Sequence, residues 1–252
     1  MMRFSSEPNY NSNINYSLTL FSMSMYPHDF STFWLITGAL LYGWILLNAL
    51  RATQWWRLRN PDDLNVLLYC MLGVFILWSI NTDIRVGESA GGPTLHLLGA
   101  TLMTLMFGWA YAVLAMSVVI IVFTLFTASS MIDSLYILPW DILLTGILPV
   151  SLSYILFRII DRYLPNHFFI YIFLNAFFGA ALAMASVILT TSLVHTLSGA
   201  YSFDNLSYTY LPYGLILMFP EAFTTGMLMS VFVVYRPEWV STFDDQRYLR
   251  NR

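Results

Sequence analysis

The sequence has no lysine, a single cysteine and few charged residues of either sign. Only 10% of its 252 residues are charged, whereas a soluble domain carries about 25%. Hydrophobic residues make up 58% of the chain. A chain with so little charge and so much apolar surface is expected to lie within a lipid bilayer.

Further absences exclude classes of function. Cys70 has no second cysteine with which to form a disulfide or a thiolate cluster. A net charge of −3 without any basic run gives no surface for nucleic acid. The sequence contains no H-E-x-x-H, G-x-S-x-G, C-x-x-C or P-loop motif, so it predicts no enzyme, and ATP hydrolysis would reside in separate subunits. Without an internal repeat, an inverted-repeat transporter is not supported.

The apolar segments predict an all-α fold, a polytopic membrane helix bundle of about seven transmembrane helices. A span needs about 20 mostly apolar residues. A shorter stretch, residues 95–107, merges with the next span into one apolar run, which we expect to cross twice by turning at Gly108-Trp109. The outer loops are expected at residues 81–94, 128–139 and 198–212. The longer spans lie near residues 33–50, 64–80, 110–127, 140–160, 168–195 and 213–235.

The arginines indicate the orientation of the bundle. Nine of the eleven fall in one set of alternating connections, and only Arg3 and Arg85 fall in the other. By the positive-inside rule the first set is cytoplasmic, which places the N-terminus outside and the C-terminus inside the cell inner membrane. The nine are Arg51, Arg57, Arg59, Arg158, Arg162, Arg236, Arg247, Arg250 and Arg252.

The chain is expected to form one membrane domain, residues 25–240. Residues 1–24 are polar and are interpreted as a disordered leader or as residues upstream of the true start, and residues 241–252 as a cytoplasmic tail. Within the first outer loop, three glycines and Pro93 favour irregular backbone. Such backbone persists at membrane depth only where protein or water satisfies it, so this loop is expected to dip into the bundle.

Glu221 is the strongest single candidate for function and, with His96 and His28, a candidate metal-site residue. It follows Pro220, eight residues into the last predicted span and about 12 Å below the outer end. An ionisable group in a span is costly and normally faces the bundle interior or a water-filled cavity. The alternative is a hydrogen-bonded carboxyl that holds helices together.

His96 is the second candidate, at the start of the short third span. We expect it just inside a helix, with Gly99 one turn further on the same face, so that another segment can approach the imidazole. Neutral imidazole suits nickel, cobalt, copper and zinc. A lone histidine at a span end can equally be a packing residue. His28, before the first span, is another candidate ligand, and the secondary candidates near the outer ends of the spans are Asp83, Glu88, Asp141 and His195.

Three motifs resemble the CbiM/NikM family, the membrane substrate-binding components of energy-coupling-factor transporters for cobalt and nickel. Residues 91–99 (GGPTLHLLG), running into 105–109 (LMFGW), resemble the family's Gly-rich loop, its His-x-x-Gly and the following turn. Residues 220–222 (PEA) resemble its Gly-Glu-Gly, and residues 25–30 (MYPHDF) loosely resemble its N-terminal metal-binding segment. The chain is similar to a divergent proteobacterial branch of this family.

The resemblance implies a substrate-capture permease that takes up a divalent transition metal, Co²⁺ or Ni²⁺, and binds no cofactor permanently. Its implied partners are the lipid bilayer, a transmembrane coupling subunit and ATPase subunits. The inner loops and the segment from Arg236 to Trp239 are expected to contact the coupling subunit. Tyr26 stands where the family has an N-terminal histidine, and His28 is the imidazole close enough to replace it.

An alternative is a non-transport membrane protein, such as an assembly or stability factor for another complex. In that case His96 and Glu221 would be structural hydrogen-bonding groups in a polar core.

Overall fold

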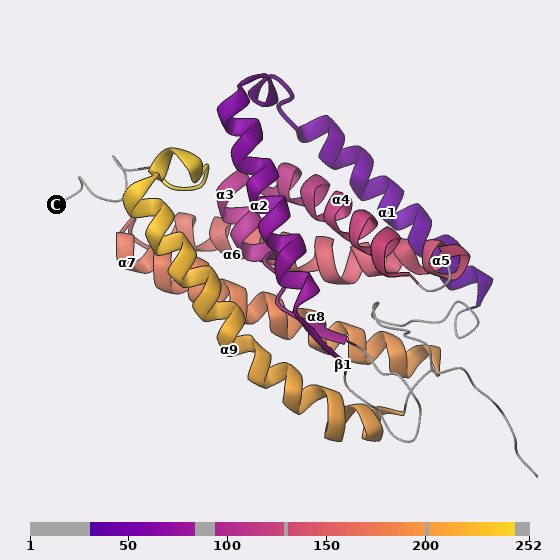
Figure 1. Cartoon of the computed structure of the whole chain (residues 1–252). Helices are drawn as coiled ribbons and strands as arrows, with labels where there is room; N and C mark the ends of the chain where they lie inside the picture. Colours follow the sequence, from indigo (N-terminus) through magenta and orange to yellow (C-terminus); the bar gives the residue numbers. More distant parts are fainter. Residues whose placement is uncertain (1–30, 84–93, 129–130, 200–201, 245–252) are drawn as a thin grey trace, which may run out of the picture.

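The computed structural model describes residues 31–83, 94–128, 131–199 and 202–244. In this part of the chain the fold is a helix bundle with one short β ribbon (Figure 1). The elements in chain order are α1 (Thr32–Ala52), η2 (Arg57–Arg59), α2 (Pro61–Ser79), β1 (Asn81–Asp83), β2 (Thr94–His96), α3 (Ala100–Phe107), α4 (Trp109–Thr127), α5 (Met131–Asp141), η3 (Ile142–Ile147), α6 (Leu148–Tyr163), α7 (Phe168–Ile170), η4 (Tyr171–Phe178), α8 (Gly179–Ser198), α9 (Phe203–Tyr235) and η5 (Pro237–Trp239).

Within the described residues, six helices are long and apolar enough to cross a membrane, which confirms the predicted all-α membrane fold. The third predicted span differs, because α3 has only eight residues and rises about 12 Å. The six non-helical residues before it, 94–99, can reach roughly 20 Å when extended. Only a fully extended stretch would bring this segment to the roughly 30 Å of the hydrocarbon core, whereas the strand covers only Thr94–His96 and Gly99 is left-handed. The six long helices are Thr32–Ala52, Pro61–Ser79, Trp109–Thr127, Met131–Tyr163, Phe168–Ser198 and Phe203–Tyr235.

The turn predicted at Gly108-Trp109 is present. Helix α3 ends at Phe107, α4 begins at Trp109, and Gly108 between them has φ +81°. Glycine adopts this conformation without the steric cost that a Cβ atom would add. One residue therefore reverses the chain between two buried helices.

Two predicted outer loops, residues 128–139 and 198–212, are mostly helical, so the prediction of loops there was wrong. Helix α5 runs through Pro139 and α9 runs through Pro212. Neighbouring helices and local π adjustments can satisfy the backbone groups that a proline frees in a membrane helix. One such adjustment, η3, directly precedes the turn that contains Pro149, which has no N–H to donate.

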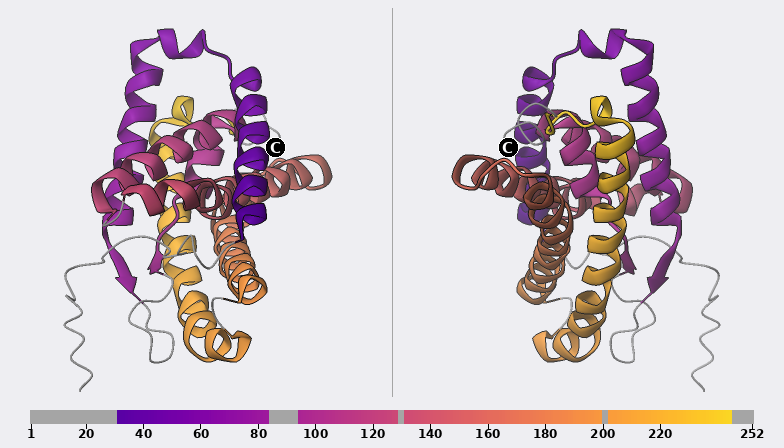
Figure 2. Two further views of the ribbon diagram at one scale, coloured as in Figure 1. Left: turned by 90° about the vertical axis from the view of Figure 1, so that its right-hand side faces the viewer. Right: turned by 90° about the vertical axis from the view of Figure 1, so that its left-hand side faces the viewer.

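Helix α3 lies in the middle of the bundle. Every residue from Ala100 to Met106 is buried, and α3 packs against α4, α6, α8, α9 and η4. The Thr101 and Ser153 hydroxyls join α3 to α6 at 2.8 Å. By contrast, α1 and α2 lie on the outside of the bundle, where both pack against α4, and the segment that carries η2 joins them across one end (Figure 2).

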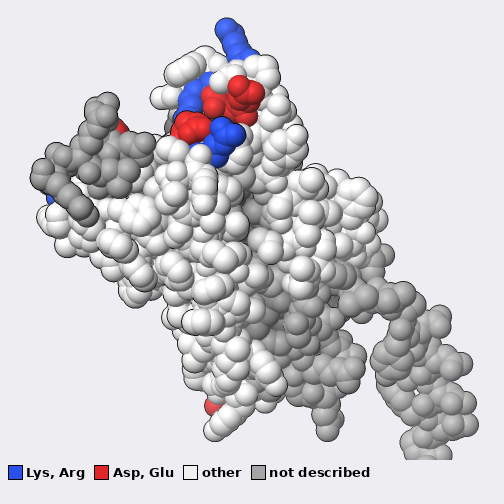
Figure 3. Space-filling model, turned by 60° about the vertical axis from the view of Figure 1, so that its left-hand side comes forward, with Lys and Arg blue, Asp and Glu red and all other residues white. Residues whose placement is uncertain are grey.

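All six described arginines lie at one end of the bundle, which we call the arginine end. The charged side chains on the face shown in Figure 3 gather mainly there. Two hydrogen bonds show that the segments between the helices meet at this end. The Tyr111 hydroxyl at the start of α4 donates to the Gln54 carbonyl between α1 and α2, and the Ser241 amide after η5 donates to the Met106 carbonyl at the end of α3. The orientation of this end in the membrane stays a prediction. The six are Arg51, Arg57, Arg59, Arg158, Arg162 and Arg236.

Candidate functional site

The β ribbon carries His96. Helix α2 leads directly into β1, which pairs antiparallel with β2, so that Asn81 lies opposite His96. The prediction that His96 lies inside a helix with Gly99 one turn along was therefore wrong. Gly99 has φ +66° and precedes the first helical residue, Ala100. Because the left-handed conformation does not continue a right-handed helix, α3 cannot extend back to His96.

The His96 ring is buried against α2. It is 7% exposed, and its centroid lies 4.0 Å from the ring of Trp78 at an interplanar angle of 40°. Its Nδ1 lies 3.2 Å from the carbonyl oxygen of Leu97. A carbonyl oxygen only accepts, so this contact assigns the ring proton to Nδ1 and the lone pair to Nε2. Nε2 makes no hydrogen bond with any described residue, and this tautomer is the one that can ligate a metal through Nε2.

Glu221 reaches the same segment from α9. The side chain is 2% exposed, and its two oxygens accept hydrogen bonds from the backbone N–H groups of Leu98 at 2.7 Å and Gly99 at 3.0 Å. Because α9 begins at Phe203, Glu221 lies in the middle of a 33-residue helix rather than near its start. The structure thus brings together the two strongest sequence candidates, joined through the backbone of residues 96–99.

Trp78 is a member of this site that sequence reasoning missed. Its Nε1–H donates to the Leu98 carbonyl at 3.1 Å, and its ring lies beside His96. The signal available in the sequence was that a tryptophan within an apolar span must find an acceptor for its N–H once it is buried. Leu98 is therefore held on both sides, through its carbonyl by α2 and through its N–H by α9.

The other end of α3 is also held from outside the helix. The Ser241 N–H donates to the Met106 carbonyl at 2.8 Å, and the Thr242 hydroxyl donates to the Leu105 carbonyl at 2.6 Å. The Tyr171 hydroxyl lies 2.7 Å from the same Thr242 hydroxyl. A short helix leaves a large share of its backbone groups without intrahelical partners, and here the residues that follow α9 supply some of them.

Among the described residues, the remaining sequence candidates do not form a metal-binding group of three with His96. Asp141 is 6% exposed, and its Oδ1 has no partner among the described residues. His195 is 1% exposed, in the last turn of α8. The backbone of Asp83 ends β1, whereas His28 and Glu88 lie outside the described residues. Among described residues, no three His, Cys, Asp or Glu side chains form a group that could hold a metal.

Asn175 is a buried polar residue that the sequence analysis did not single out. It is 3% exposed and lies in the π-helical segment η4, which packs against α9, α8 and α6. Neither atom of its amide has a partner among the described residues. Buried amides of this kind commonly hold an ordered water, so Asn175 marks a polar position within the core.

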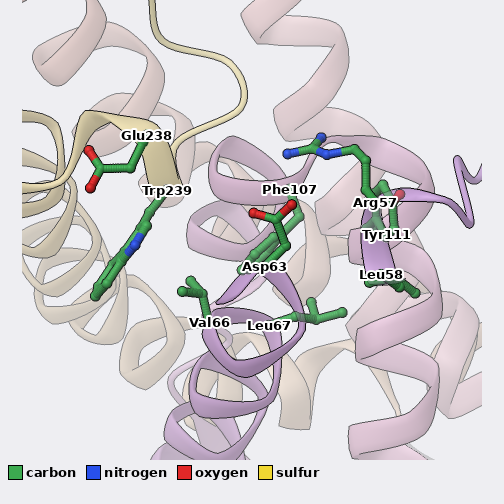
Figure 4. Close-up of a pocket in the computed structure, with 9 residues that line it drawn as sticks. All are labelled: Arg57, Leu58, Asp63, Val66, Leu67, Phe107, Tyr111, Glu238 and Trp239. Carbon is green, nitrogen blue, oxygen red and sulfur yellow. The ribbon is translucent and has the colours of Figure 1, made fainter. Parts of the chain in front are cut away.

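Two hollows lie at the arginine end and do not include His96 or Glu221. A cavity of about 20 Å³ has Asp63 and Phe107 between Arg57 on one side and Trp239 on the other (Figure 4). A larger cleft of about 580 Å³ is lined by residues 107–111 together with Arg158 and Asp161. Their mixture of cationic, acidic and aromatic side chains is typical of contact surfaces rather than of a transition-metal site.

Comparison with known proteins identifies the family. The model of the cobalt uptake substrate-specific transmembrane region, CbiM, matches residues 28–239. No curated protein matches the chain, and no solved structure matches it either. The match spans the six long helices, the β ribbon and α3. The chain therefore belongs to the CbiM family of membrane components for cobalt uptake.

Proposed function

We propose that this protein captures Co²⁺ for an energy-coupling-factor transporter and presents it to a separate coupling subunit driven by ATPases. Ni²⁺ is the second candidate cargo. The observation that carries the proposal is the Nδ1 contact of His96 with the Leu97 carbonyl, which leaves the Nε2 lone pair available to a borderline divalent metal. Family membership supports cobalt as the substrate.

A single imidazole does not make a capture site, so other donors are needed. We propose His28 as the next ligand, from the segment that precedes α1. The loop between β1 and β2 contains Glu88 and follows Asp83, so it starts and ends at the ribbon that carries His96. Asp83, Glu88, Asp141 and His195 remain further candidate donors. A site that combined imidazole and carboxylate would suit Co²⁺ better than Mg²⁺ or Ca²⁺.

The arginine end is the proposed contact surface for the coupling subunit, on the cytoplasmic side of the inner membrane. Trp239 is half-buried there, and the Arg236 guanidinium lies 5.6 Å from its ring centroid. The cleft of about 580 Å³ next to the Gly108 turn offers both arginine and aspartate side chains. Such mixed aromatic and arginine surfaces are common at protein–protein contacts.

The proposed capture function is tested by His96→Ala. The purified variant should bind Co²⁺ at least 100-fold more weakly than the parent, because the side chain removed is a metal ligand. Calorimetry and elemental analysis of the retained metal measure this loss. His28→Ala should weaken binding less.

The matched control is His167→Ala. His167 is exposed and caps α7 beyond the arginine end of α6, so its loss should leave Co²⁺ binding unchanged. A well-folded His96→Ala protein with parental Co²⁺ affinity would overturn the proposed function.

A further inference from the structure

Residues 97–99 are non-helical backbone, and Leu98 and Gly99 are buried in the bundle. Leu98 is 2% exposed, and its N–H and that of Gly99 precede the first turn of α3. No intrahelical carbonyl is available to N–H groups at this position. In a water-poor interior an unpaired N–H is costly, so an acceptor must come from another part of the chain.

The two carboxylate oxygens of Glu221 are the acceptors for these two N–H groups. One accepts from Leu98 at 2.7 Å and the other from Gly99 at 3.0 Å. The carboxylate also lies at the N-terminal end of α3, where the helix dipole favours a negative charge. A glutamine could not substitute fully, because its amide has one accepting oxygen and its NH₂ group would face the second N–H donor.

The held segment leads directly to His96. Trp78 donates to the Leu98 carbonyl and packs against the His96 ring, and the ring itself contacts the Leu97 carbonyl. The Leu97 carbonyl belongs to the same peptide unit as the Leu98 N–H, so the group that contacts the imidazole is joined directly to a residue that Glu221 holds. Resting on the proposed function, we propose that Glu221 is a positioning residue that fixes the His96 segment and is not itself a ligand of the metal ion.

The first test is amide hydrogen exchange of the fragment 94–107 in the metal-free protein. Glu221→Gln should speed exchange at Leu98 or Gly99 about tenfold, the equivalent of one lost hydrogen bond. Thr225→Val is the matched control, because Thr225 is buried one turn further along α9 and is not bonded to residues 98–99. Equal exchange in Glu221→Gln, Thr225→Val and the parent would show that Glu221 does not hold the Leu98 and Gly99 amides.

The second test distinguishes positioning from ligation. Co²⁺ added to the parent should leave exchange at Leu98 and Gly99 unchanged or slower, since Glu221 keeps both amides. If Glu221 were a ligand, the metal would draw it away and exchange there would rise. Glu221→Gln should also weaken Co²⁺ binding 10- to 100-fold, as is usual for residues that orient a ligand. Parental affinity in Glu221→Gln would overturn the positioning role.

These outcomes separate the inference from the proposed function. If His96→Ala retains parental Co²⁺ affinity, the proposed capture site is wrong. The exchange result for Glu221→Gln still shows whether Glu221 holds the Leu98 and Gly99 amides. If His96→Ala loses binding and Glu221→Gln does not, the site stands and the positioning role fails.

Discussion

Among the described residues, the segment Met131–Tyr163 and residues 94–107 both depart from the regular α-helix, but they do so in opposite ways. The segment Met131–Tyr163 contains the π-helical stretch η3 and Pro149 but continues as one helical run of 33 residues. Residues 94–107 break completely, with a strand, three non-helical residues and an eight-residue helix. Gly99 and Gly108, both with positive φ, bound that helix.

The difference lies in where the backbone finds its hydrogen bonds. A π turn keeps its N–H and carbonyl groups paired within the same helix, so the segment needs no outside partner. A full break leaves backbone groups without partners in the same helix, so other elements must satisfy them. Glu221 and Trp78 do so before α3, and residues 241–242 do so at its other end. The broken segment therefore depends on the tertiary fold, and it is the one that carries His96.

The largest effect should come from removing the outside partner. Glu221→Leu leaves the N–H groups of Leu98 and Gly99 buried without acceptors, at about 1–3 kcal/mol each. We expect the free energy of unfolding to fall by about 2–6 kcal/mol, measured by denaturant titration in detergent. A loss below about 0.5 kcal/mol would show that another group or a water satisfies these amides.

An intermediate effect is expected at the glycine before α3. Gly99→Ala places a Cβ 2.9 Å from Val74 Cγ2 and forces a side chain into φ +66°. Strain of this kind costs about 1–3 kcal/mol, visible as a lower unfolding temperature. Gly73→Ala is the control, because a Cβ there meets nothing within 4 Å and alanine favours the helix. If both variants were equally stable, the break would not require glycine.

The smallest effect is expected in the continuous segment. Gly146→Ala in η3 brings a Cβ to the same distance, 2.9 Å, from Ile120 Cδ1. That atom is the end of a flexible side chain, and Gly146 does not have a positive φ. The gain in helix preference offsets part of the crowding, so we expect a change of about 1 kcal/mol or less in the same unfolding assay. A loss as large as that of Gly99→Ala would show that crowding, not backbone conformation, separates the two segments.

Some parts of the fold were predictable because their cause is local. A run of apolar residues partitions into lipid whatever it packs against, so the membrane class followed from composition. Gly108 could be recognised as a turn because a long apolar run without a polar loop must reverse at a flexible residue. The shared position of Arg51, Arg158 and Arg236 followed from counting the crossings between them.

Other expectations failed because the deciding interactions are not local. The apolar run of residues 95–107 favoured a helix through His96, but pairing with β1 and the positive φ of Gly99 prevent it. Residues 128–139 and 198–212 were expected to be loops, but α5 and α9 continue through Pro139 and Pro212. Trp78 gave no sign of its acceptor, because Leu98 lies 20 residues further along the chain.

By itself the sequence determined that this chain lies in a membrane, where it turns back on itself, and that the block around His96 resembles a metal-capturing family. Each of these depends on neighbouring residues. Only the tertiary structure decided what Glu221 does, because its partners Leu98 and Gly99 are 123 and 122 residues away. The bilayer makes unpaired backbone costly, and the fold alone brings the acceptor that satisfies it.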